Sequence, residues 1–208
     1  MPKEQVRRLI GPVYEDAALL HGTAVEAALM MFETGALPAG RKRCSCAKEL
    51  RTRFYLMPVT EELPAEYRDR FPGFDRAETL FETKSYAESN AEDRYTIAQL
   101  VAAGLPERKA TMICCEWAYG TRHRIPGKER ARAESIDYGE LRAGADKRKG
   151  VLVEIDKTIL GLNIEKDPDG DGLFLHFPRG LPAKYVRRIE PQGPEERQTL
   201  DDYLARIS

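Results

Sequence analysis

The stretch ALLHGTAVEAALMMFETGALP, residues 18–38, decides the fold predicted for this chain. An apolar run at residues 18–20 leads into the polar tripeptide HGT at residues 21–23. Apolar side chains then recur at spacings of three and four, as in an amphipathic helix: Val25, Ala28, Leu29 and Phe32. Gly35 suits a left-handed helix cap, and Pro38 blocks continuation. The stretch therefore predicts a strand, a tight polar turn and a helix.

The polar tripeptide is the first candidate for a binding site. His21, Gly22 and Thr23 place an imidazole, a bare backbone and a hydroxyl side by side where the predicted strand ends. Gly22 would let the backbone approach a ligand closely, and the two flanking side chains offer hydrogen bonds. The alternative is that His21 is a structural residue whose ring is satisfied within the fold.

Composition limits the class of protein. A length of 208 residues suggests one domain, and 42% apolar with 32% charged residues is typical of a soluble globular chain. The net charge of −1 argues against a molecule built as a whole for nucleic acid. We find no apolar run long enough for a transmembrane helix and no signal-peptide pattern, so we expect a cytoplasmic protein. The four cysteines, in a C-x-C and a C-C pair, favour reduced thiols over a metal site.

Two aromatic segments follow the opening stretch. Residues 53–59, RFYLMPV, are rich in aromatic and apolar side chains and predict a strand that contains Tyr55. Residues 78–83, which contain Phe81, predict another short strand. A flat ligand could stack on Tyr55, or the ring could belong to the core. The S-x-x-E pattern at Ser85 then predicts the start of a long helix that ends near residue 103.

The middle of the chain holds its only concentration of basic residues. Residues 110–118 are apolar and predict a buried strand. Residues 120–150 follow, and they hold nine lysines and arginines against five acids, densest at Arg122-His123-Arg124. This segment predicts an exposed insertion loop that either contacts a phosphate backbone or is only a mobile surface element.

The last third of the chain predicts strands and one helix. Residues 150–156, GVLVEID, read as a strand, and the Asp-Gly steps of residues 167–172 read as a hairpin turn. The returning strand at residues 173–177 contains His176 and follows Asp171. A terminal helix is expected from Pro194 to about residue 207.

The order of these segments resembles the ADP-ribosyltransferase superfamily, which includes poly(ADP-ribose) polymerases, DarT-like toxins and RNA 2′-phosphotransferases. The resemblance rests on the strand-HGT-helix-Gly order, on the aromatic strand, and on GVLVEID paired with LPAKYVRRIE at residues 181–190. It implies an α+β fold in which helices pack on the outer sides of a split, mostly antiparallel sheet. A single domain would span residues 1–208, with the insertion loop around residues 120–150.

The resemblance implies NAD as the substrate. His21, Gly22 and Thr23 would hold the nicotinamide ribose and carboxamide, and Tyr55 would stack on the nicotinamide ring. Phe81 is the rival for that stacking position. Side chains of His21 and Tyr55 are therefore expected to face one cleft.

The implied function is an NAD-dependent mono-ADP-ribosyltransferase acting on a protein or nucleic acid, with no membrane partner and with an inhibitory partner protein left open. Where polymerase-like members carry a glutamate, this chain has none, and Asp171 or His176 would take the catalytic position beside His21 and Tyr55. Two alternatives remain: an RNA 2′-phosphotransferase-like enzyme, or a non-catalytic binding module on the same fold.

Overall fold

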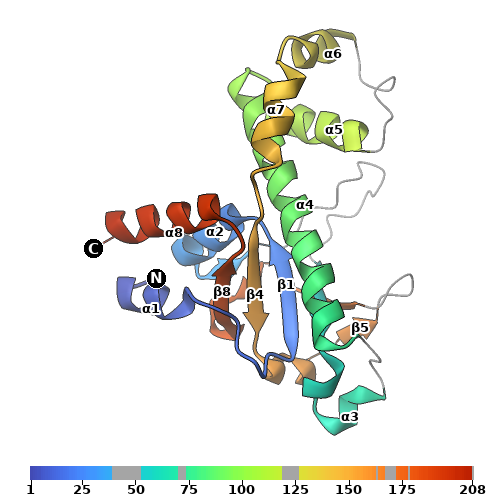
Figure 1. Ribbon diagram of the computed structural model, residues 1–208, viewed down its shortest axis with the longest axis vertical. Helices are drawn as coiled ribbons and strands as arrows, with labels where there is room; N and C mark the ends of the chain where they lie inside the picture. Colours follow the sequence, from blue (N-terminus) through green and yellow to red (C-terminus); the bar gives the residue numbers. More distant parts are fainter. Residues whose placement is uncertain are drawn as a thin grey trace.

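The chain forms a mixed α+β structure in which helices pack against an antiparallel sheet, as predicted (Figure 1). It is seen in a computed structural model that describes residues 1–38, 53–69, 74–118, 127–162, 164–166, 172–177 and 179–207. A six-stranded sheet with the order β5-β6-β3-β1-β4-β8 forms the centre, and β2 pairs with β7 beside it. Every strand pair is antiparallel.

The strands and helices follow the chain in this order. The strands are β1(Leu19–Thr23), β2(Ala36–Leu37), β3(Arg53–Pro58), β4(Val151–Ile155), β5(Ile164–Lys166), β6(Leu173–His176), β7(Leu181–Pro182) and β8(Val186–Pro191). The helices are α1(Lys3–Leu9), α2(Val25–Thr34), α3(Ala65–Arg68), α4(Arg76–Ala102), α5(Glu107–Ala118), α6(Gly127–Glu134), α7(Tyr138–Ala145) and α8(Pro194–Arg206). Short 3₁₀ turns lie at η1(Thr60–Glu62), η3(Lys157–Gly161) and η4(Ala183–Tyr185).

The opening stretch folds as a strand and a helix, as its sequence predicts. Gly35 caps α2 in the left-handed conformation with φ 79°, and its N–H donates to the Met31 carbonyl. The predicted polar turn is wrong, because the HGT tripeptide belongs to β1 and is buried. Pairing with β4 continues through Thr23, so Ala24 alone links the strand to the helix.

The main core lies on one face of the sheet, where α1, α2 and α8 cover it (Figure 1). Every second residue of each strand faces this core, among them Leu19, Phe54, Leu56, Val151 and Val153. The helices contribute buried residues such as Val6, Met31, Phe32, Leu200 and Tyr203. Because side chains alternate along a strand, the residues between these positions point to the opposite face. That face is covered by α4.

The long helix α4 begins earlier than its sequence predicts. Asp75 caps it in a reciprocal capping box with Glu78, so the strand predicted at residues 78–83 and the helix start predicted at Ser85 are both wrong. Two threonines that favoured a strand are accommodated because their hydroxyls find carbonyls. Thr83 donates to Thr79 O at 2.6 Å, and Thr79 donates to Pro58 O at 2.9 Å.

Small residues let α4 lie directly on the sheet. Its buried stripe repeats every four residues: Thr79, Thr83, Ala87 and Ala91. A Cβ on Gly22 of β1 would overlap the Thr83 carbonyl oxygen and lie 2.7 Å from the Ala87 nitrogen. Gly150, with φ 70°, meets the same helix, because its Cβ would overlap the Ala87 carbonyl. The helix backbone therefore rests on the strand backbone.

A helical lobe extends beyond the sheet, made of α5, α6, α7 and the C-terminal part of α4 (Figure 1). It has a small core of its own, formed by Leu100, Leu105, Ala110, Ile113 and Ala133. The strand predicted at residues 110–118 is wrong: an apolar run can form a buried helix as well as a strand, and the residues of α5 bury one side against this core.

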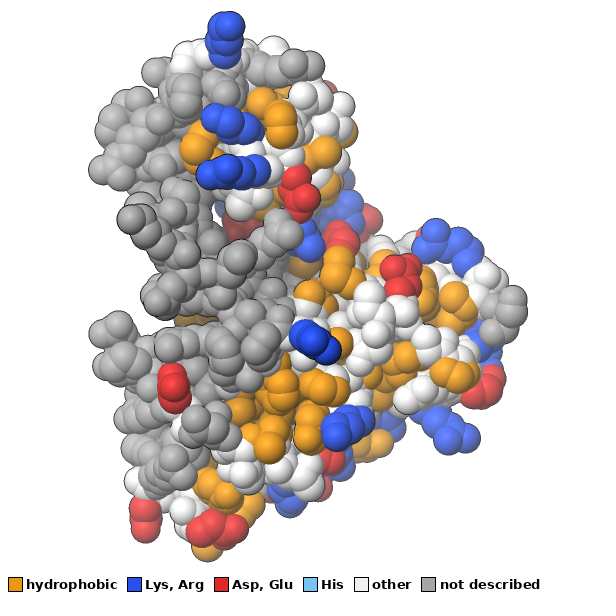
Figure 2. All heavy atoms as spheres, turned by 180° about the vertical axis from the view of Figure 1, so that it is seen from behind, with side chains coloured by type: hydrophobic (Ala, Val, Ile, Leu, Met, Phe, Trp, Pro, Cys, Tyr) orange, Lys and Arg blue, Asp and Glu red, His pale blue; other side chains and the backbone are white. Residues whose placement is uncertain are grey.

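The predicted insertion loop at residues 120–150 is also largely wrong. Two helices, α6 and α7, occupy most of it, and Leu141 and Ala145 of α7 are buried. Asp137 caps α7 by accepting from the Gly139 and Glu140 amides. The densest basic point, Arg122-His123-Arg124, lies outside the described residues. Figure 2 shows lysine and arginine side chains spread on the outer surface of the lobe.

The close contact between α4 and β1 predicts the effect of one substitution. Gly22→Ala should destabilise the protein by about 1–3 kcal/mol, because the added methyl group forces two backbone segments apart. Gly161→Ala is the matched control, since a Cβ there meets nothing within 4 Å. Urea unfolding of both variants measures the difference. Equal midpoints for the two variants would contradict the close contact.

Candidate functional site

The candidate site lies where β1 and β3 separate. Their ladder pairs only Leu19 with Pro58 and Leu20 with Met57 among the residues that the structure describes. The Ala18 carbonyl accepts from Val59 N at 3.0 Å, so even-numbered residues of β1 point their backbone polar groups toward β3. Gly22 has the same parity, but the ladder with β3 does not extend to it. Its carbonyl therefore lies on an edge of β1 that no described strand covers.

A side chain from α4 satisfies this carbonyl. Asn90 donates from Nδ2 to Gly22 O at 3.2 Å and to Tyr86 O at 2.9 Å. The bond to Gly22 uses a primary amide on a neighbouring helix in place of the missing strand partner. The edge of β1 is thus occupied by a carboxamide donor.

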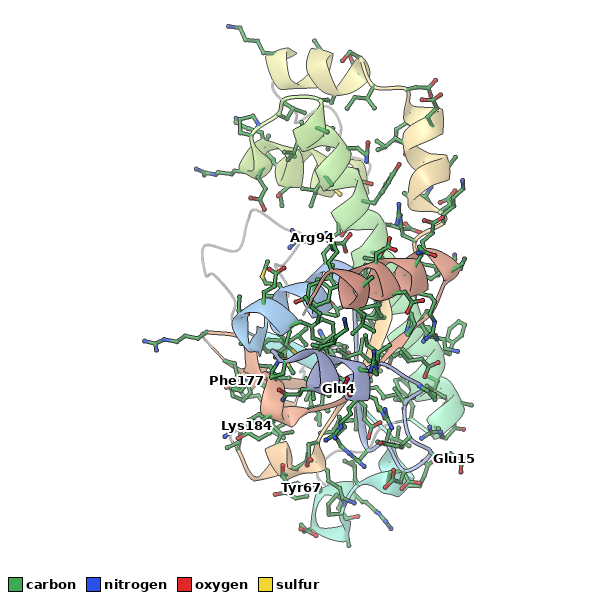
Figure 3. All side chains as sticks on the ribbon, turned by 90° about the vertical axis from the view of Figure 1, so that its left-hand side faces the viewer. Glu4, Glu15, Tyr67, Arg94, Phe177 and Lys184 are labelled. Carbon is green, nitrogen blue, oxygen red and sulfur yellow. The ribbon has the colours of Figure 1, made fainter. Side chains whose placement is uncertain are left out.

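Three α4 residues form a ridge beside this edge: Tyr86, Asn90 and Arg94. Their spacing of four places them on one side of the helix. On another side of α4, Glu88 pairs with Lys149, just before β4, and Glu92 lies 3.7 Å from Arg142 of α7. We call Tyr86, Asn90 and Arg94 the α4 ridge. Figure 3 labels Arg94 beside α4, just above α2 in that view.

His21 is held as a neutral ring. It is 7% exposed, its Nδ1–H donates to the Tyr55 carbonyl at 2.8 Å, and its edge meets Phe54 with ring centroids 5.8 Å apart. Burial lowers the pKa of His21, and the bond to the Tyr55 carbonyl opposes that shift only in part. Because a carbonyl can only accept, the proton of the neutral ring is on Nδ1, and Nε2 carries a lone pair.

His21 and Tyr55 do not face one cleft. Gly22 faces α4, so its neighbour His21 points toward the opposite side of β1, where it meets Phe54. Tyr55 follows Phe54 in β3, and its ring meets Tyr86 of α4 at 5.0 Å. The prediction of a shared cleft is therefore wrong for the two side chains, and only the Tyr55 backbone reaches His21.

The Tyr55 ring is packed rather than open. Tyr86 lies against it at a tilt of 44°, and a Cβ on Gly172 would collide with it. Tyr86, in contrast, is 43% exposed. Of the two rings, Tyr86 offers the larger free surface to a flat ligand.

Gly22 and Thr23 are less accessible to a ligand than their predicted roles require. The α4 backbone occupies the space where a Gly22 side chain would lie. A ligand can therefore reach Gly22 only at its carbonyl, on the edge of β1 toward β3. Thr23 is buried and pairs with Val151 at the end of β1. Its side chain shares the face of His21, because the two residues are separated by one position.

The remaining predicted residues are Phe81, Asp171 and His176. Phe81 is 71% exposed, and its place midway between the buried Thr79 and Thr83 turns it away from the sheet. Asp171 lies outside the described residues. His176 is in β6 with its backbone opposite Arg53, and its side chain is not described. No catalytic carboxylate is therefore placed by the described part of the chain.

The α4 ridge was missed by the sequence reasoning. A signal existed, because an aromatic, an amide and a cation recur every four residues within one helix. Its meaning depends on which side of α4 faces the open edge of β1. That side is set by the buried stripe ending at Ala91 and by Gly22 on another element, so it requires the tertiary structure.

Comparisons of the chain with protein-family models, curated proteins and solved structures found no match. Within the described ranges, no group of three or more His, Cys, Asp or Glu side chains is arranged to hold a metal ion. None of the described helices has the length and apolar character to span a membrane.

The buried neutral His21 predicts a pH dependence of stability. The unfolded chain binds a proton at the ordinary pKa of 6.5, whereas the folded pKa is lower. The unfolded state therefore binds more protons between these values, and stability falls as pH decreases below 6.5. Urea unfolding at about pH 7.5 and about pH 5.5 should show a larger loss in the wild type than in His21→Gln. An equal loss in both proteins would show that His21 does not titrate in this way.

Proposed function

We propose that this chain binds NAD at the open edge of β1 and transfers ADP-ribose to a macromolecular acceptor, protein or nucleic acid. The observation that supports this best is the hydrogen bond from the Asn90 carboxamide to the Gly22 carbonyl. Nicotinamide carries the same chemical group. The order of motifs, which resembles that of ADP-ribosyltransferases, supports the same choice of ligand.

The residues around the edge suit the parts of such a ligand. The nicotinamide carboxamide would replace the Asn90 amide at the Gly22 carbonyl. Tyr86, with its exposed ring on the α4 ridge, would stack on the pyridine ring. Tyr55 would act through Tyr86, against which its ring lies.

The reaction breaks the bond between nicotinamide and C1′ of its ribose. Nicotinamide leaves with the bonding electron pair, and the ribose passes through an oxocarbenium-like state, as in glycoside cleavage. A nucleophilic oxygen or nitrogen of the acceptor then bonds to C1′ and releases its proton. Holding the leaving group at Gly22 O supplies orientation. Asp171 stays the proposed source of a stabilising carboxylate on sequence grounds alone.

The prediction that tests this proposal uses two exposed tyrosines. Tyr86→Ala should weaken NAD binding roughly tenfold, the usual scale for loss of an aromatic stacking partner. Tyr138→Ala is the matched control, because Tyr138 is also exposed, at 47%, and lies on α7 in the helical lobe. Isothermal titration with NAD measures both variants against the wild type.

Release of nicotinamide completes the test. Wild-type protein with NAD and either protein, DNA or RNA as acceptor should release nicotinamide, and Tyr86→Ala should release it more slowly. NAD binding without release would leave a binding module on this fold. If NAD neither binds nor is cleaved, the proposal fails, and transfer from a 2′-phosphorylated RNA becomes the next assay.

A further inference from the structure

Arg94 is a partly buried cation that lacks a partner among the described residues. No ion pair or hydrogen bond joins its guanidinium to any residue in the described ranges. The α4 positions three and four residues away are all uncharged: Asn90, Ala91, Ile97 and Ala98. A carboxylate at one of those spacings could have paired with Arg94 along the helix surface.

Neighbouring cations on the other side of α4 are paired. Lys149 contacts Glu88, and Arg142 lies 3.7 Å from Glu92 and 2.8 Å from Asp146. Among the described residues, Arg94 therefore differs from these two cations, which have carboxylate partners. Partial burial of an unpaired guanidinium costs free energy, which an anionic ligand would recover.

The position of Arg94 on the α4 ridge suggests which kind of anionic ligand it binds. A helix rises 1.5 Å per residue, so Arg94 lies about 6 Å beyond Asn90 and about 12 Å beyond Tyr86. The ridge thus presents, in order, an aromatic ring, an amide at the Gly22 carbonyl, and a cation. An elongated ligand with a ring and a carboxamide at one end and an anionic group further along matches this order.

We infer that Arg94 binds the pyrophosphate of NAD, an inference that rests on the proposed function. In NAD one ribose separates nicotinamide from the pyrophosphate, so a ligand anchored at Gly22 extends its phosphates along α4. The planar guanidinium donates two parallel hydrogen bonds to phosphate oxygens. Arg94 is then a binding residue that fixes the direction of the dinucleotide along the ridge.

The test compares two probes that differ only beyond the ribose. NAD carries the pyrophosphate, and nicotinamide riboside carries no phosphate. Arg94→Gln should weaken NAD binding tenfold or more, the scale of a lost charged hydrogen bond, and leave riboside binding within about twofold. Arg94→Lys should keep part of the NAD affinity, because an ammonium retains the charge without the bidentate geometry. Arg108→Gln on α5 is the control, an exposed arginine away from the ridge.

The outcomes separate this inference from the proposed function. If wild-type protein binds both probes and Arg94→Gln binds NAD as tightly as the wild type, the inference is wrong and the proposed function stands. Equal weakening of both probes would also overturn it, because Arg94 would then support the whole site. If wild-type protein binds neither probe, the proposed function fails, and the inference fails with it.

Discussion

The contact between the backbones of α4 and β1 is the constraint on which the rest of the structure depends. Gly22 and Gly150 leave no side chain between helix and sheet, and the α4 stripe that meets them is limited to threonine and alanine. Because this contact fixes the rotation of α4, it decides which helix residues face β4 and which face the edge left by β3. The ion pair of Lys149 with Glu88 and the bond from Asn90 to Gly22 are two consequences of one docking geometry.

Short-range sequence patterns correctly predicted the helices and strands whose formation depends mainly on neighbouring residues. The helix ending at Gly35, the strands β3, β4 and β6, and the terminal helix α8 all follow from periodicity, caps and breakers. Prediction failed where the same pattern fits two structures. Residues 78–83 and 110–118 have strand-like composition, but burial along one side of a helix satisfies them equally well.

The sequence predicted some residues near the candidate site but not their arrangement. His21 and Gly22 were predicted to lie in a turn after a strand, whereas they lie within β1, with His21 Nδ1 bonded to the Tyr55 carbonyl and the Gly22 carbonyl bonded to Asn90. Tyr55 was placed in the right strand but on the wrong face, because parity between separate strands depends on register. The α4 ridge required the docking of α4, which no local pattern encodes.

We propose that NAD lies along the open edge of β1, between Gly22 and the α4 ridge. Hydrogen–deuterium exchange with and without NAD tests it most directly, since backbone amides report the contacted segments separately. Slower exchange confined to β1 and to the middle of α4, with α6 and α7 unchanged, is the predicted result. Protection only in the helical lobe, or no change at any peptide at saturating NAD, would contradict the claim.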